Sequence, residues 1–282
     1  MSGKSSARSV WHGRVNSVVS AINTKRLLQI HLLLVGLFIY SQVIALLIFS
    51  FNSGGITFPF VDITLDWYNQ VLQSGGFSAS FVNSVKLAAA VTVVVTVLST
   101  GSALAFRHRF SGKNLIIYLF LLGIVTPGIM YGIGITVFLG EVVGLRQGLW
   151  LGLPVHVVWA LPFSFILFLA GMPPDLTDHE EAARVFGAND FEVAYTIILP
   201  EIKFQVFGAA VFAFTLSYNE LDRSLLLLGT DNTMPLEVYS VASRDPTPGL
   251  AALGSLTSTV SIVVLILSFA LILYGRSAAS SS

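Results

Sequence analysis

The sequence predicts an all-α integral membrane protein with six transmembrane helices and both termini in the cytoplasm. The composition gives the first reason, since 54% of the 282 residues are hydrophobic, only 11% are charged, and the mean hydropathy is +0.80. Soluble proteins carry about 25% charged residues, so this chain cannot cover a water-exposed surface. The second and third reasons are six long apolar runs and an uneven distribution of lysine and arginine between them.

The six predicted spans account for most of the chain. They are residues 27–51, 85–106, 115–139, 149–170, 204–228 and 253–274, and each meets the ~20 apolar residues that a bilayer core requires. The first run is too long for a signal peptide and lacks a small-residue cleavage site, so we expect it to be retained. These bounds leave an N-terminal tail (1–26), a six-helix domain (27–275) and a C-terminal tail (276–282) that is too short and polar to fold.

The positive charges predict the orientation. If the N-terminus is cytoplasmic, the inside segments hold eleven lysines and arginines and the outside loops hold two. The inside residues are Lys4, Arg8, Arg14, Lys25, Arg26, Arg107, Arg109, Lys113, Arg184, Lys203 and Arg276; the outside residues are Arg146 and Arg244. This bias places both termini and residues 177–200 in the cytoplasm.

The outside segments are expected to be mostly irregular. In residues 52–73, apolar side chains between Leu65 and Leu72 share one helical face, which predicts a short interfacial helix. Trp67 and Tyr68 favour anchoring at the lipid headgroups, with docking of an extracytoplasmic protein as the alternative. Residues 229–249 are rich in proline, glycine and aspartate, which predicts an irregular loop.

Helix breakers interrupt the third and fourth spans, at Thr126-Pro127-Gly128 and at Pro154 and Pro162. Such breaks are tolerated where neighbours or a water-filled cavity satisfy the freed backbone groups, and small residues also allow close packing. A packing role and a role in a translocation path therefore stay open. His156 is expected to be packed and hydrogen-bonded, because no second histidine or cysteine is spaced to form a metal site.

A polar run over residues 177–200 separates the fourth and fifth spans. Two capping-box spacings mark helix starts, Thr177 with Glu180 and Asn189 with Glu192. They predict two short helices, over residues 178–186 and 190–198. Gly187 lies between them, where a helix end favours positive φ, and Pro200 can open the following helix.

This run also carries a recognisable signature. Glu181-Ala182-Ala183, Gly187, Ile197 and Leu199-Pro200 occur at the spacing of the EAA motif, and the chain resembles permease subunits of binding-protein-dependent ABC importers. Leu65-Asp66-Trp67-Tyr68, Asn83-Ser84 and Pro235-Leu236-Glu237-Val238-Tyr239 are similar to the spermidine/putrescine-type branch. The alternative is an ordinary cytoplasmic helical hairpin, which needs only caps and a glycine.

The resemblance implies a MetI-like type I importer permease in the bacterial inner membrane, with residues 177–200 as the loop that couples to an ATPase. The implied coupling residues are Glu180, Glu181, Ala182, Ala183, Gly187, Ala188, Leu199 and Pro200. The implied partners are a second permease subunit, forming a heterodimer, two ATPase subunits that bind ATP and Mg²⁺, and an extracytoplasmic binding protein. No cofactor in this chain and no nucleic acid are implied. The substrate would be a polyamine or a related amine or amino-acid-like compound.

A polar cluster near the end of the fifth span is the candidate substrate path. Its residues, with one aromatic from the fourth span, are Trp159, Tyr218, Asn219, Glu220, Asp222 and Arg223. Glu220 would lie about 24 Å along the span, in the outer half of the ~30 Å core, where ionisable groups face an aqueous path or a partner. The alternative is an internal ion pair of Arg223 with Glu220 or Asp222.

The sequence offers no support for catalysis by this chain. It has no cysteine, no P-loop for nucleotide binding and no metal or nucleophile motif. An ion-coupled secondary transporter that uses Glu220 or Asp222 is the alternative function, although no inverted repeat is evident.

Overall fold

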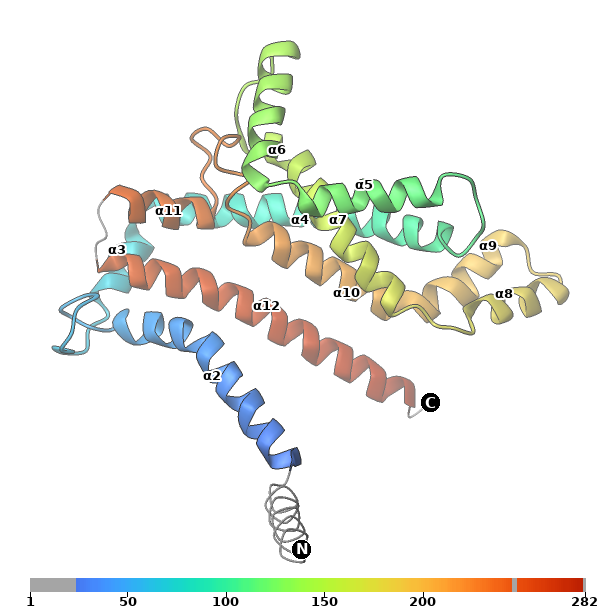
Figure 1. Ribbon diagram of the computed structural model, residues 1–282, viewed down its shortest axis with the longest axis horizontal. Coiled ribbons are helices and arrows are strands. Elements are labelled where there is room, and N and C mark those ends of the chain that lie inside the picture. Colours follow the sequence, from blue (N-terminus) through green and yellow to red (C-terminus); the bar gives the residue numbers. More distant parts are fainter. Residues whose placement is uncertain (1–23, 245–247, 281–282) are drawn as a thin grey trace, which may run out of the picture.

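The computed structural model describes residues 24–244 and 248–280, and in these the fold is all-helical (Figure 1). The long helices are α2 (Thr24–Phe49), α4 (Gly75–Ala105), α5 (Lys113–Val125), α7 (Gly152–Ala170), α10 (Leu199–Tyr218) and α12 (Gly249–Ser280). The shorter ones are α3 (Asp66–Gln73), α6 (Gly128–Ile135), α8 (Leu176–Val185), α9 (Asp190–Val193) and α11 (Met234–Arg244). The predicted helix over the end of the first outside loop is confirmed as α3.

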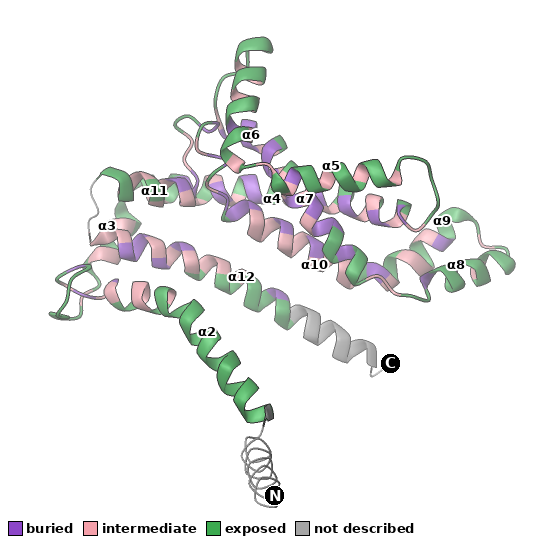
Figure 2. Cartoon of the chain, in the orientation of Figure 1, coloured by how far each residue is buried: buried purple, intermediate pink, exposed green. Residues whose placement is uncertain are grey.

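Helices α4, α7 and α10 form the centre of the molecule and contact one another along their lengths. One face of α4 is buried, and its residues are Ser80, Ser84, Leu87, Ala88, Val91, Val95, Ser99 and Ala103. The spacing of three and four residues follows the helical period, and several members are small, which lets helices approach closely in a membrane. Many of the buried residues lie on these three helices and others on α11 and the start of α12, while most of α2 is exposed (Figure 2).

The third predicted span is broken, as its helix breakers predict, whereas the fourth is a continuous helix, α7, with Pro162 inside it. Helix α5 ends at Val125, and the chain bends by 99° before α6 begins at Gly128. A π-helical turn over Thr136–Val142 then extends α6. A residue before proline is driven to extended geometry, and Thr126 has φ −67° and ψ 126°. Among the described residues, five helices are long and apolar enough to cross a membrane, or six if this bent pair is one span.

The fifth span differs from its prediction at both ends. The helix is continuous from Asp190 to Tyr218, so Pro200 does not separate it from the second short helix. Residues 219–228 are not helical, although the sequence places them in the span. The Glu220 carboxylate accepts a hydrogen bond from the Arg223 backbone at 3.0 Å, and this local side-chain bond replaces a helical one.

Two further expectations about the outer segments and the C-terminus are wrong. Residues 234–244 form α11, with Pro235 in its first turn, where proline costs no hydrogen bond. Helix α12 continues to Ser280, so most of the predicted tail is helical. The predicted N-terminal tail lies mainly outside the described residues.

The aromatic residues of α3 are bound to protein groups rather than reaching outward. Trp67 donates to the Asn52 carbonyl at 3.0 Å, and the Tyr68 hydroxyl lies 2.6 Å from the Ser50 hydroxyl and 2.9 Å from that of Ser255. Both side chains are half-buried. They join α3 to the segment after α2 and to α12, and anchoring at the lipid headgroups stays a prediction.

Candidate functional site

The polar run forms a hairpin of α8 and α9, here called the α8–α9 hairpin (residues 176–198), at one end of the bundle (Figure 1). Gly187 has φ +92° at the turn, as its position predicts. The Asn189 side chain accepts from the backbone of Glu192, whose carboxylate accepts from the Asn189 backbone at 2.8 Å. The second predicted capping box is therefore confirmed.

The first predicted capping box is wrong, because Glu180 is directed into the protein. Its carboxylate forms an ion pair with the Arg107 guanidinium, which follows α4, and the Glu180 residue is 3% exposed. Arg107 also donates to the Thr177 hydroxyl at 3.1 Å. The implied role of Glu180 as an ATPase contact does not fit this geometry; Glu180 instead joins α8 to the end of α4.

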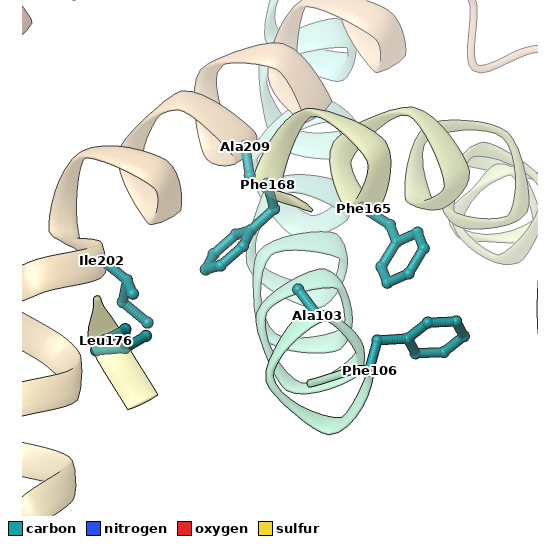
Figure 3. Packing of buried hydrophobic residues seen from close by; sticks show 7 residues of the cluster. All are labelled: Ala103, Phe106, Phe165, Phe168, Leu176, Ile202 and Ala209. Atoms are coloured by element: carbon teal, nitrogen blue, oxygen red, sulfur yellow. The ribbon is translucent and has the colours of Figure 1, made fainter. Parts of the chain in front are cut away.

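A hydrophobic cluster lies beside this ion pair (Figure 3). It brings together the ends of α4 and α7 and the starts of α8 and α10, through Ala103, Phe106, Phe165, Phe168, Leu176, Ile202 and Ala209. Phe106 and Phe165 meet edge to face with ring centroids 4.8 Å apart. The base of the hairpin is therefore fixed to the helices at the centre of the fold.

The tip of the hairpin is exposed and partly apolar. Of the predicted coupling residues, Glu181, Ala182, Gly187, Leu199 and Pro200 are exposed, and Ala183 and Ala188 are half-buried. Phe186 is 90% exposed, and Val185, Phe191 and Tyr195 are also exposed. These four apolar residues were not predicted from the sequence, although large apolar side chains in a polar run are themselves a signal of a contact surface.

A cavity of about 370 Å³ lies at the other end of the helix that leaves the hairpin. We call it the Arg223 pocket; it is lined by Ile124, Val125, Thr126, Pro127, Gly128, Trp159, Asn219, Glu220, Leu221, Asp222 and Arg223. Five of the six predicted path residues therefore line one pocket, together with the break between α5 and α6. The helix breakers at Thr126-Pro127-Gly128 were the sequence signal for that second wall.

Arg223 is the central charge of this pocket. Its Nη1 donates to the Glu220 carboxylate at 3.1 Å, and its guanidinium lies 3.8 Å from the centre of the Trp159 ring. Arg223 is only 5% exposed. The predicted ion pair is confirmed for Glu220, whereas Asp222 is exposed and has no ion pair among the described residues.

His156 holds the non-helical segment that carries these charges. Its ring nitrogens lie 2.9 Å from the hydroxyls of Ser217, near the end of α10, and Ser224, in the following segment. The histidine is fully buried, so the prediction of a packed, hydrogen-bonded residue is confirmed.

Tyr218 does not belong to the pocket. Its side chain is buried in a separate hydrophobic cluster with Ala88, Met234 and Leu253, and its ring stacks on Phe214. The prediction that it lines a substrate path is therefore corrected. Adjacent residues at a helix end point in different directions, and the sequence alone could not separate Tyr218 from Asn219.

The fold and these two features define a helical transmembrane transport subunit, with an exposed hairpin at one end and a charged pocket between its helices. Residues 96–278 match the family described as "Binding-protein-dependent transport system inner membrane component", and the chain belongs to this family. It is thus a multi-pass inner-membrane permease subunit of the ABC importer type. The ion-coupled alternative finds no support in this match.

Relatives and solved structures agree with the assignment. The chain is 27% identical over 233 residues to the spermidine/putrescine transport system permease protein PotC of Escherichia coli K12, covering 82% of this chain and 88% of that protein. It is 25% identical over 240 residues to the putrescine transport system permease protein PotI of the same strain, covering 81% and 84%. A chain of the bacterial alginate ABC transporter, solved in complex with an alginate pentasaccharide-bound periplasmic protein, superposes with a TM-score of 0.66 at 18% identity, over 88% and 94% of the two chains. At that identity the likeness shows the fold alone.

Proposed function

We propose that this chain forms one half of an import path for a small amine or amino-acid-like compound, and that the α8–α9 hairpin transmits the work of a separate ATPase to the Arg223 pocket. The observation that carries this proposal is the unbroken helix Asp190–Tyr218. It has 29 residues and is therefore about 43 Å long, with the hairpin at its start and the pocket directly after its end. The run includes a π-helical turn over Ala194–Ile198, and its continuous backbone connects the hairpin to the pocket.

The cytoplasmic end of the transmission would be the hairpin tip. The exposed apolar side chains of Val185, Phe186, Phe191 and Tyr195 offer a surface for a cleft in an ATPase subunit. Glu181 lies on the exposed face and can supply charge there, while Ala182 permits close approach. The positive-inside bias supports a cytoplasmic position for this tip, where ATP and Mg²⁺ bound by two ATPase subunits would act.

Inside the protein, two contacts would carry a displacement of the tip into the bundle. The Arg107–Glu180 pair joins α8 to α4, and the His179 ring lies 2.6 Å from the Glu201 carboxylate of α10. Nucleotide binding to the ATPases would favour one of two positions of this unit, which is how a ligand shifts a two-state element. The pocket would then open alternately to the two sides of the membrane.

The remaining assembly follows from the relatives. PotC and PotI are named as permeases of polyamine systems, which supports an amine as substrate. The alginate transporter was solved with a periplasmic protein, which supports delivery by an extracytoplasmic binding protein. A second permease subunit would complete the path.

Purification and reconstitution test the proposal. The chain should co-purify with an ATPase subunit and have no ATPase activity when isolated. In proteoliposomes that also contain the binding protein, uptake should stop with vanadate and continue with an uncoupler. ATP hydrolysis by the isolated chain, or uptake that stops only with uncouplers, would overturn it.

A further inference from the structure

Arg223 has hydrogen-bonding capacity that the described protein does not use. Its Nε is buried and has no hydrogen-bond partner among the described residues. A buried N–H without an acceptor costs free energy, and more so on a charged group. The guanidinium lines the Arg223 pocket and already has one carboxylate, Glu220, on Nη1. A further acceptor bound in the pocket beside the guanidinium would use the remaining capacity of Arg223.

The start of α6 adds positive potential at the same place. Pro127 is the N-cap of α6, no side chain caps the helix, and Pro127 and Gly128 both line the pocket. A Cβ on Gly128 would lie 3.0 Å from Arg223 Nη1, so the guanidinium packs directly on this helix start. The backbone N–H groups of a first turn and the helix dipole favour an anion there. Broken membrane helices present such ends to acidic groups of substrates.

The opposite charge is also present in the pocket. Asp222 is exposed, and its carboxylate forms no ion pair or hydrogen bond among the described residues. Asn219 is exposed beside it, but its amide nitrogen donates to the Thr215 carbonyl at 2.9 Å and its amide oxygen accepts from the Ser261 hydroxyl at 3.1 Å. Since Glu220 is committed to Arg223, Asp222 is the acid available to an incoming ammonium group.

We propose that the Arg223 pocket binds a compound with both an amine and an acidic oxygen group, the ammonium at Asp222 and the acid at Arg223, beside the start of α6. The proposal rests on the proposed function and narrows its substrate class. A simple diamine would place its second ammonium beside the guanidinium and the positive helix end, and a diacid would face Asp222. A zwitterion satisfies both ends of the pocket.

A unique cysteine provides the test, because the natural chain has none. Asn219→Cys places a thiol in the pocket wall, and Thr126→Cys places one in the wall formed by the α5–α6 break. In the purified complex with its ATPase, the rate of thiol labelling is measured in the presence of one of three probes of similar length. 4-Aminobutyrate carries both an amine and an acid, putrescine carries only amines, and butyrate carries only an acid. 3-Aminopropylphosphonate replaces 4-aminobutyrate in a fourth arm and distinguishes a phosphonate from a carboxylate.

We expect either aminoacid-type probe to protect both cysteines about tenfold more than putrescine or butyrate, as the loss of one charge-assisted hydrogen bond predicts. Arg223→Lys keeps the charge for Glu220 but removes Nε–H, and Asp222→Asn removes the ammonium partner; each should abolish that preference. Arg146→Lys and Asp62→Asn, exposed residues outside the pocket, are the matched controls and should retain it.

Three results would each overturn the zwitterion proposal. They are equal or stronger protection by putrescine, protection by none of the four probes, and a preference that survives Arg223→Lys. Such results leave the proposed function intact if the complex still couples vanadate-sensitive uptake to ATP hydrolysis. If the unmodified chain does not associate with an ATPase subunit, that result would instead count against the proposed function.

Discussion

The Arg107–Glu180 pair gives the sharpest test of how the hairpin is held. The two side chains are 11% and 5% exposed, so each charge is largely removed from water. Breaking a buried pair by removing one partner costs about 3 kcal/mol, because the other charge is left uncompensated. A free energy of about 3 kcal/mol corresponds to roughly a hundredfold increase in the population of a locally opened hairpin.

Trypsin measures this opening at Arg184, which lies in α8 and is cut only when the helix is released. In inside-out vesicles, Arg107→Ala and Glu180→Ala should each accelerate cleavage at Arg184 about a hundredfold. Arg107→Ala should accelerate cleavage at least as much as Glu180→Ala. When Glu180 is removed, Arg107 still donates to Thr177, whereas when Arg107 is removed, Glu180 has no second side-chain partner among the described residues.

The double variant distinguishes a true pair from two independent contributions. With both charges removed, no uncompensated charge remains, so Arg107→Ala with Glu180→Ala should cleave within about tenfold of the wild type. Glu181→Ala, the exposed neighbour, is the matched control and should cleave at the wild-type rate. If the double variant shows the product of the two single effects, or if Glu181→Ala matches Glu180→Ala, the pairing argument is refuted.

Three further predictions follow from single positions. Gly187→Val, at φ +92° with open space around a Cβ, should cost about 1–3 kcal/mol of backbone strain, leaving membrane insertion normal but weakening co-purification of the ATPase; normal association would show that the turn geometry does not matter for docking. A cysteine at Asn189 should react with impermeant thiol reagents only after the membrane is opened, and labelling of intact cells would reverse the orientation. Gly128→Ala should displace Arg223 and impair uptake while ATPase association persists, because its Cβ would lie 2.9–3.0 Å from Asp222 and Arg223. The control is Gly134→Ala, whose Cβ would have nothing within 4 Å and which should transport normally. Equal uptake by the two variants would contradict this prediction.

Much of the fold could be predicted because membrane insertion depends on local properties. The length of apolar runs identified the spans, and Asn189, Gly187 and the face of residues 65–72 marked the hairpin and α3. The errors lie where a polar side chain had two possible partners. Glu180 fits a capping box with Thr177 but pairs with Arg107, and Glu220 ends the fifth span by accepting from the Arg223 backbone.

The candidate site could be predicted as residue types but not as a geometry. Five of the six predicted path residues line one pocket, while Tyr218 lies in a hydrophobic cluster. The pocket wall formed by the break between α5 and α6 depends on the 99° bend after α5. The sequence could not predict it, because a proline in a span signals a break without fixing its angle.

By itself, the sequence determined the all-helical membrane class and the polar hairpin, because these depend on composition and on spacing within about twenty residues. The type of transport subunit followed from the resemblance of the EAA motif to that of importer permeases. Only the tertiary structure decided that Glu180 joins Arg107, 73 positions away, and that Arg223 lies between Trp159 and the start of α6. The physical reason is that a charge removed from water is stabilised by whichever partner the packed helices bring to it, and that choice is made across the bundle rather than along the chain.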